Sequence, residues 1–226
     1  GKNVLKMSRS LVDLSSEYNI TAEELGQQLR VSRTKLFMKR ESRQRPSLDD
    51  KQLTSWNALM ITGLTHAYEA SGNEEYSKLA DATAKFLLAK LFDGKKLKRT
   101  YKAGKASINA FLDDYTFLVS ALIRLYTITF DKTWLGQADQ LLEVVLTEFR
   151  QANTDFFNFK SSVDQPLYAT KQVLEDNVIP AGNSEVAKNL SMLGTLLDKK
   201  EYLDLSEKLV LQLEPRIKEH AAFYYN

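Results

Sequence analysis

Carboxylates and amides recur at regular positions along this chain. Asp50 stands before Asn57 at the same interval as Asp176 before Asn183, and an aspartate pair that includes Asp114 lies between the two repeats. Glycoside cleavage needs one protonated and one ionised carboxyl on opposite sides of a sugar bond. Amides both donate and accept hydrogen bonds, as recognition of hydroxyl groups requires. The pattern therefore predicts a polar ligand, a sugar, where these side chains converge.

The aspartates divide into catalytic and binding candidates. Because successive helical residues are about 100° apart, only one of the neighbours Asp113 and Asp114 can face a cavity. We expect Asp114 to act with Asp50 or Asp176 as the catalytic carboxylates, and Asp49 and Asp113 to bind substrate. The alternative is that these residues are helix N-caps, each stabilising by about 0.5–2 kcal/mol.

The other candidates for substrate binding share a place at or just before an expected helix start. Trp56 and Tyr115 offer rings that stack on the apolar face of a sugar, although aromatic residues at helical spacing are also typical of a core. Each Asn fits a cap as well as a ligand contact, and a lysine there fits a structural ion pair. The set comprises Lys51, Trp56, Asn57, Tyr115, Asn183 and Ser184.

The composition excludes several classes of function. The 226 residues are 43% hydrophobic and 27% charged, which is ordinary for a globular protein, and 31 basic against 29 acidic side chains give a net charge of +2. The basic residues gather over 30–51, and no stacking pattern of aromatic residues accompanies them. We interpret that run as the solvated face of a helix and expect no nucleic-acid partner.

Metal, redox and membrane roles are also disfavoured. The chain has no cysteine and two histidines, so disulfides, thiolate sites and histidine-built metal sites are not expected, nor any cofactor. The longest apolar stretch, 111–130, is interrupted by Asp113, Asp114 and Arg124 and does not fit a membrane span. We expect a cytoplasmic protein.

The elements expected to carry these residues are mostly helices. Only four prolines and nine glycines occur, apolar residues repeat at intervals of three and four, and no segment has a convincing strand pattern. Thr21 and Glu24 form a capping box, which predicts a helix from about residue 22 with Leu25, Leu29 and Leu36 facing inward.

Three helical hairpins follow. Helices are expected over about 53–70 and 108–129 and from about 183, each followed by a return helix near Tyr76, Trp134 or Tyr202, with a long connection over 151–180. The first helix is expected to bury Trp56, Leu59, Met60, Leu64, Ala67 and Tyr68, and the helix over 108–129 is apolar on most faces, which suits an inner position. The return helices carry narrower apolar stripes, at Trp134, Leu135, Ala138, Leu141, Leu142, Val145 and Phe149 and at Tyr202, Leu205, Leu209 and Leu213. These hairpins exceed the 34-residue tetratricopeptide unit. The spacing favours an α/α toroid.

Three motifs resemble one known family. They are the segment 45–57 (Arg-Pro-Ser-Leu-Asp-Asp-Lys-Gln-Leu-Thr-Ser-Trp-Asn), Phe-Leu-Asp-Asp-Tyr at 111–115, and 176–184 (Asp-Asn-Val-Ile-Pro-Ala-Gly-Asn-Ser). In this order they resemble the thioredoxin-domain-containing proteins of the spermatogenesis-associated and YyaL-like type. The resemblance implies an N-terminal thioredoxin-like domain, not present in this sequence, followed by a six-hairpin toroid similar to that of sugar epimerases and glycosidases.

From these observations we expect an all-α protein that is part of an (α/α)6 toroid, with residues 1–226 as a single fragment of a longer chain. Two hypotheses about function stand. One is a domain that binds or processes carbohydrate through carboxylates at its mouth. The other is a non-catalytic helical scaffold or partner-binding domain, whose cavity or outer surface holds a protein partner and which is associated with the thioredoxin-like domain of the same full-length chain.

Overall fold

The computed structural model describes residues 6–151, 154–165 and 171–224. Contacts within the chain divide it into two compact units, Gly1–Asp49 and Asp50–Asn226. The three expected hairpins all lie in the second unit. The expectation of a single domain over 1–226 therefore stays a prediction for the part that precedes Asp50.

The first unit is a pair of helices, α1 (Leu11–Glu17) and α2 (Ala22–Glu41). The capping box is present: the Glu24 amide donates to Thr21 Oγ1 at 3.1 Å, and the Thr21 amide donates to the Glu24 carboxylate at 2.8 Å. Leu25 and Leu29 are partly buried, whereas Leu36 is 55% exposed and the expectation that it faces inward is wrong. The seven residues of α1 are too few to cover the twenty of α2.

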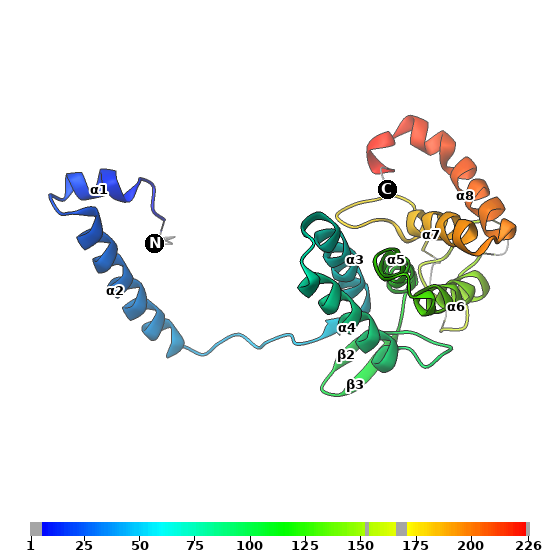
Figure 1. Cartoon of the computed structure of the whole chain (residues 1–226), viewed down its shortest axis with the longest axis horizontal. Helices are drawn as coiled ribbons and strands as arrows, with labels where there is room; N and C mark the ends of the chain where they lie inside the picture. The colour runs from blue at the N-terminus through cyan, green and yellow to red at the C-terminus, as the bar shows by residue number, and fades with distance from the viewer. Residues whose placement is uncertain (1–5, 152–153, 166–170, 225–226) are drawn as a thin grey trace. The chain divides into compact units, whose positions relative to one another are not determined.

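The second unit contains the three expected hairpins in sequence. They are α3 (Thr54–Ser71) with α4 (Glu74–Leu91), α5 (Leu112–Thr129) with α6 (Lys132–Glu148), and α7 (Gly182–Leu197) with α8 (Lys200–Glu219), followed by the short η1 (Ala221–Phe223). Helix α5 packs against both α3 and α7 and lies between them in Figure 1. The first helices of the hairpins are thus neighbours, as an arc of a toroid requires.

Each hairpin turns at one residue in the left-handed conformation. Gly72, Phe130 and Asp198 have φ of 68°, 56° and 55° at the ends of α3, α5 and α7. The side chains of Asn73 and Asp131 then cap α4 and α6 by accepting hydrogen bonds from first-turn amides. This turn brings each return helix back antiparallel to the helix before it.

The core confirms most of the expected helix faces. Helix α5 is buried on most of its surface, which suits its central place, and the α6 stripe predicted from the sequence is buried as well. The face predicted for α3 is confirmed only in part: Leu64 is buried and Leu59 packs against the core, whereas Trp56 and Met60 are 65% and 61% exposed. The buried face also carries Ala58, Ile61 and Thr65, small or compact residues that allow close packing on α4 and α5.

A small antiparallel sheet contradicts the expectation that no strand is present. Strands β1 (Gln52–Leu53), β2 (Lys98–Lys102) and β3 (Lys105–Asn109) pair in that order, and the β2–β3 turn places Ala103 and Gly104 at positive φ. Helix α5 therefore begins at Leu112 and not near residue 108, because Ile108 belongs to β3. The sheet holds the segment that leads into α3 against the hairpin that precedes α5.

We expect Gly194→Ala, in α7, to lower the free energy of unfolding by about 1–3 kcal/mol through overpacking. A Cβ at this position would lie 2.8 Å from Leu203 Cδ2 and 3.2 Å from the Leu203 amide nitrogen, so backbone as well as side chain would have to move. Gly136→Ala, in α6, is the matched control. No atom lies within 4 Å of its Cβ, so urea denaturation should show stabilisation of up to about 1 kcal/mol. Equal effects at the two positions would contradict the packing argument.

Candidate functional site

Asp114 is a fully buried carboxylate at the first turn of α5. It accepts hydrogen bonds from the amides of Ser55 and Phe111, both at 3.0 Å, and pairs with Arg99 Nη1 at 2.8 Å. These partners come from the start of α3, the entry to α5, and β2. Asp114 therefore ties three elements together, and the sheet is what supplies its cation.

Its neighbour Asp113 has different surroundings, as the helical geometry requires. Asp113 is only partly exposed, and its pKa is raised to about 6, chiefly by removal from water and next by the charge of Asp114, while the charges of Arg99 and Lys171 act in the opposite direction. A Cβ on Gly182, at the start of α7, would lie 3.2 Å from Asp113 Oδ1. The absence of a side chain at Gly182 therefore leaves room for this carboxyl between two inner helices.

Aromatic rings and cations stack beside the aspartate pair. The rings of Phe111 and Phe159 lie 4.7 Å apart with an angle of 24° between their planes. Arg99 lies over the outer face of Phe111 at 5.1 Å from the ring centroid, and Lys171 Nζ lies 5.8 Å from that of Phe159. Stacked in this way, the two cations hold positive charge near Asp113. We call these four residues the Phe111 stack.

The expected residues near α7 shape the loop that precedes it. Asn183 is 1% exposed; its Oδ1 accepts from the Phe157 amide at 2.8 Å, and its Nδ2 donates to the carbonyl oxygens of Phe157 at 3.0 Å and Val173 at 2.9 Å. Asp176 is 2% exposed and accepts from the Ala181 amide at 2.8 Å. Both side chains fix the course of the connection into α7.

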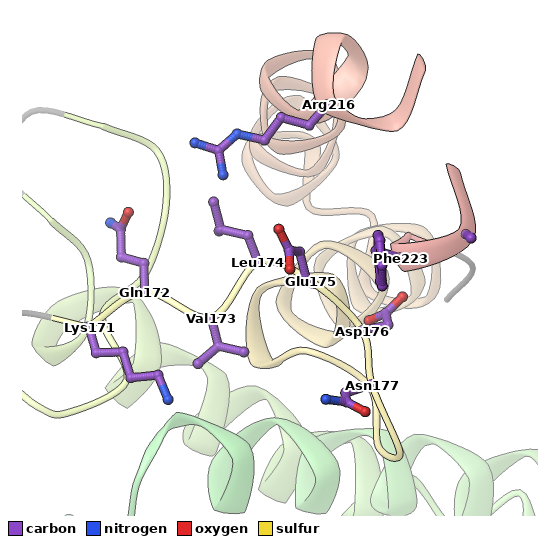
Figure 2. Close-up of a pocket in the computed structure, with 10 residues that line it drawn as sticks. Lys171, Gln172, Val173, Leu174, Glu175, Asp176, Asn177, Arg216 and Phe223 are labelled. Atoms are coloured by element: carbon purple, nitrogen blue, oxygen red, sulfur yellow. The ribbon is translucent and has the colours of Figure 1, made fainter. Parts of the chain in front are cut away.

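A cavity of about 600 Å³ opens beside this loop (Figure 2). One wall is the segment 171–177, and the other is the end of α8 with η1. The Asp176 amide donates to the Phe223 carbonyl at 2.8 Å and so joins the two walls. The lining residues are Lys171, Gln172, Val173, Leu174, Glu175, Asp176, Asn177, Arg216, Ala222 and Phe223. Lys171 belongs both to this cavity and to the Phe111 stack.

The remaining acidic and basic candidates lie on the surface. Asp50 is exposed and pairs with Lys102 Nζ at 2.6 Å, and the hydrogen bond from that ammonium lowers the pKa of the carboxyl. Asp49 and Lys51 are exposed too. The cavity is not lined by any of these three predicted residues, so the structure does not bring Asp50 together with Asp176 there.

The remaining aromatic and polar candidates have separate surroundings. Trp56 is exposed at the start of α3, and Asn57 Nδ2 donates to the Leu53 carbonyl at 2.7 Å. Tyr115 is buried; its hydroxyl accepts from the Leu97 amide at 2.9 Å, and burial raises its pKa to about 12. Ser184 lines a second cavity, of about 340 Å³, between α7 and α8. As ligand contacts these four residues stay predictions.

Sequence reasoning missed Arg99, Phe159 and Lys171 in these surroundings. Arg99 lies in a strand that was not predicted, and the other two lie in the irregular connection before α7. Within the described ranges no cluster of three or more His, Asp or Glu residues could hold a metal ion. Over the same ranges no helix is long and apolar enough to cross a bilayer.

Comparison with known sequences finds relatives of much greater length. An uncharacterized protein of Caenorhabditis elegans, B0495.5, is 31% identical over 89% of this chain and 28% of its own length. Spermatogenesis-associated protein 20 of Rattus norvegicus is 30% identical over 96% of this chain and 29% of its own length. The chain thus spans less than a third of these relatives. No family model matches it.

Solved structures with similar folds come from carbohydrate enzymes. A GH76 alpha-mannanase from Bacteroides thetaiotaomicron superposes with a TM-score of 0.60 at 14% identity, over 77% of this chain and 46% of its own. Cellobiose 2-epimerase from Spirochaeta thermophila superposes with a TM-score of 0.57 at 16% identity, and the match covers 72% of this chain and 43% of the epimerase chain. At such low identity the likeness shows the fold alone. The second unit therefore has the hairpin architecture of an (α/α)6 toroid, of which it forms an arc.

Proposed function

We propose that this chain is part of a domain that binds carbohydrate and acts on it by proton transfer, with Asp113 as the acid or base. The observation that carries the proposal is the partly exposed Asp113 carboxyl, with a pKa of about 6, at the start of the inner helix α5. A group with a pKa near neutrality both gives and takes a proton readily. The Phe111 stack beside it holds the charges of Arg99 and Lys171 close to this carboxyl.

Asp113 was predicted from the sequence to bind substrate, and the three aspartates predicted to be catalytic take different parts in this proposal. Asp114 acts as a positioning residue, because all of its described contacts are to the fold and to Arg99. Asp176 lines the cavity and remains the proposed second carboxylate. Asp50 pairs with Lys102 on the surface and is proposed to be structural. One titratable carboxyl suits hydrolysis and isomerisation alike, so the proposal covers both.

The proposal is tested with the full-length protein and a panel of neutral and acidic sugars, assayed for hydrolysis and for isomerisation. We expect Asp113→Asn to lower kcat about 10²–10⁴-fold, the usual contribution of a general acid or base. Asp81→Asn is the control, since Asp81 is a carboxylate of α4 that pairs with Lys85. If Asp113 acts as the acid, activity should be present below pH 6 and fall as the pH rises through it. Turnover unchanged in Asp113→Asn would contradict the assignment.

A scaffold function has one observation in its favour. Asp114, Asn183 and Asp176 all use polar atoms of their side chains to hold backbone groups of the fold. Under this alternative the domain supports a thioredoxin-like domain of the same cytoplasmic chain and has no substrate. It predicts that the full-length protein binds no sugar at millimolar concentration and that Asp113→Asn changes nothing in that assay.

A further inference from the structure

The cavity between the segment 171–177 and the end of α8 is lined by a cationic side chain, Arg216, that forms no ion pair with a described residue. In Figure 2 its side chain reaches from α8 toward Leu174 and Gln172. Lys171, the other cation of the lining, lies over the ring of Phe159. A guanidinium in this setting is available to an anion that enters the cavity.

The same cavity offers groups that suit hydroxyls. Glu175 is exposed in the lining, and no ion pair or hydrogen bond joins its carboxylate to another described residue. Carboxylates accept hydrogen bonds from hydroxyls, and the amides of Gln172 and Asn177 extend the polar wall. Phe223 and Leu174 supply apolar surface. A volume of about 600 Å³ lies within the ordinary range for small-molecule sites.

The two walls are joined by the chain itself. Pro215, within α8, removes one backbone hydrogen bond a turn before the helix ends, and η1 then turns back. The Phe223 carbonyl accepts from the Asp176 amide at 2.8 Å, which holds η1 against the loop. Arg216 and Glu175 therefore face one hollow from two segments far apart in sequence.

We propose that this cavity binds an acidic sugar, a uronate, whose carboxylate pairs with Arg216 while its hydroxyls donate to Glu175. The inference rests on the proposed carbohydrate function and names its substrate class. The planar guanidinium matches a carboxylate in a two-pronged geometry. A neutral sugar would leave Arg216 unused, and a phosphate dianion, with two negative charges, would meet stronger repulsion from Glu175 and Asp176 in the same lining than the single charge of a uronate does.

Calorimetric titration of the full-length protein with glucuronate, glucose and inorganic phosphate at matched ionic strength tests the inference. We expect glucuronate to bind about tenfold more tightly than glucose, a difference of about 1.4 kcal/mol, because its carboxylate forms a charge-assisted hydrogen bond with Arg216. Arg216→Gln should abolish that preference and leave glucose binding unchanged, and Arg216→Lys should retain part of it. Arg150→Gln is the matched control, because Arg150 pairs with Asp155 and does not line the cavity.

A second variant makes the test independent of Arg216. Glu175→Gln should weaken glucose and glucuronate alike, since both sugars lose the same acceptor. Three results would each overturn the inference. The wild type could bind the two sugars with equal affinity, the preference for glucuronate could survive Arg216→Gln, or phosphate could compete for the cavity as well as glucuronate does. If glucose binds and glucuronate is not preferred over it, this inference alone is contradicted. If no sugar binds, the proposed function is contradicted as well.

Discussion

Asp114→Ala is expected to lower the free energy of unfolding by about 3–5 kcal/mol, the range for removing one partner of a buried ion pair. The substitution leaves the Arg99 guanidinium without its carboxylate and leaves the amides of Ser55 and Phe111 without their acceptor. Because those groups lie on β2, α3 and the entry to α5, the loss weakens the junction of three elements. Urea denaturation of the full-length protein measures the difference.

The control for this prediction is another aspartate at a helix start. Asp131 caps α6 through the Thr133 amide at 2.9 Å, is exposed, and takes no part in a buried ion pair. Asp131→Ala should therefore lower the free energy of unfolding by only about 0.5–2 kcal/mol, as for an ordinary N-cap. Similar losses for the two variants would mean that Asp114 is a cap and no more, and that its pairing with Arg99 contributes little.

The sequence predicted the hairpins well where one face of a helix alone is apolar. The α6 stripe from Trp134 to Phe149 and the stripe of α8 at Tyr202, Leu205, Leu209 and Leu213 are buried as expected. The same reasoning succeeded only in part for helix α3, because the apolar Trp56 and Met60 are exposed while the smaller Ala58 and the polar Thr65 lie on the buried face beside Ile61 and Leu64. The periodicity of apolar residues predicts that a helix is present, but it does not predict which face is buried when both faces carry apolar side chains.

The sheet was missed for a related reason. Strands β2 and β3 are five residues each and rich in lysine, so their alternation is weak, and the hairpin depends on the left-handed Ala103 and Gly104 at its turn. This omission carried over to the site. The sequence required Asp113 and Asp114 to face differently, but which of them is buried depends on Arg99, which reaches Asp114 from β2.

Asp113→Asn is expected to stabilise the protein at neutral pH. The pKa of Asp113 is raised from 3.8 to about 6 by folding, so the folded protein holds the proton more tightly than the unfolded chain. Stability from this group is fully present below about pH 4 and is lost as the pH rises through 6. A difference of this size corresponds to about 3 kcal/mol at most, and solvent screening of a partly exposed group reduces it to about 1–2 kcal/mol.

The amide of Asn resembles the protonated carboxyl and does not ionise, so the variant escapes this loss. The free energy of unfolding of Asp113→Asn minus that of the wild type should therefore grow between pH 4 and pH 7 by that amount, with the contributions of all other carboxylates cancelling in the difference. A constant difference over this range would contradict the raised pKa. If Asp113→Asn is more stable than the wild type and also loses turnover, the Asp113 carboxyl lowers stability while it supports activity. That combination is expected of a functional group and not of a helix cap, which stabilises the fold.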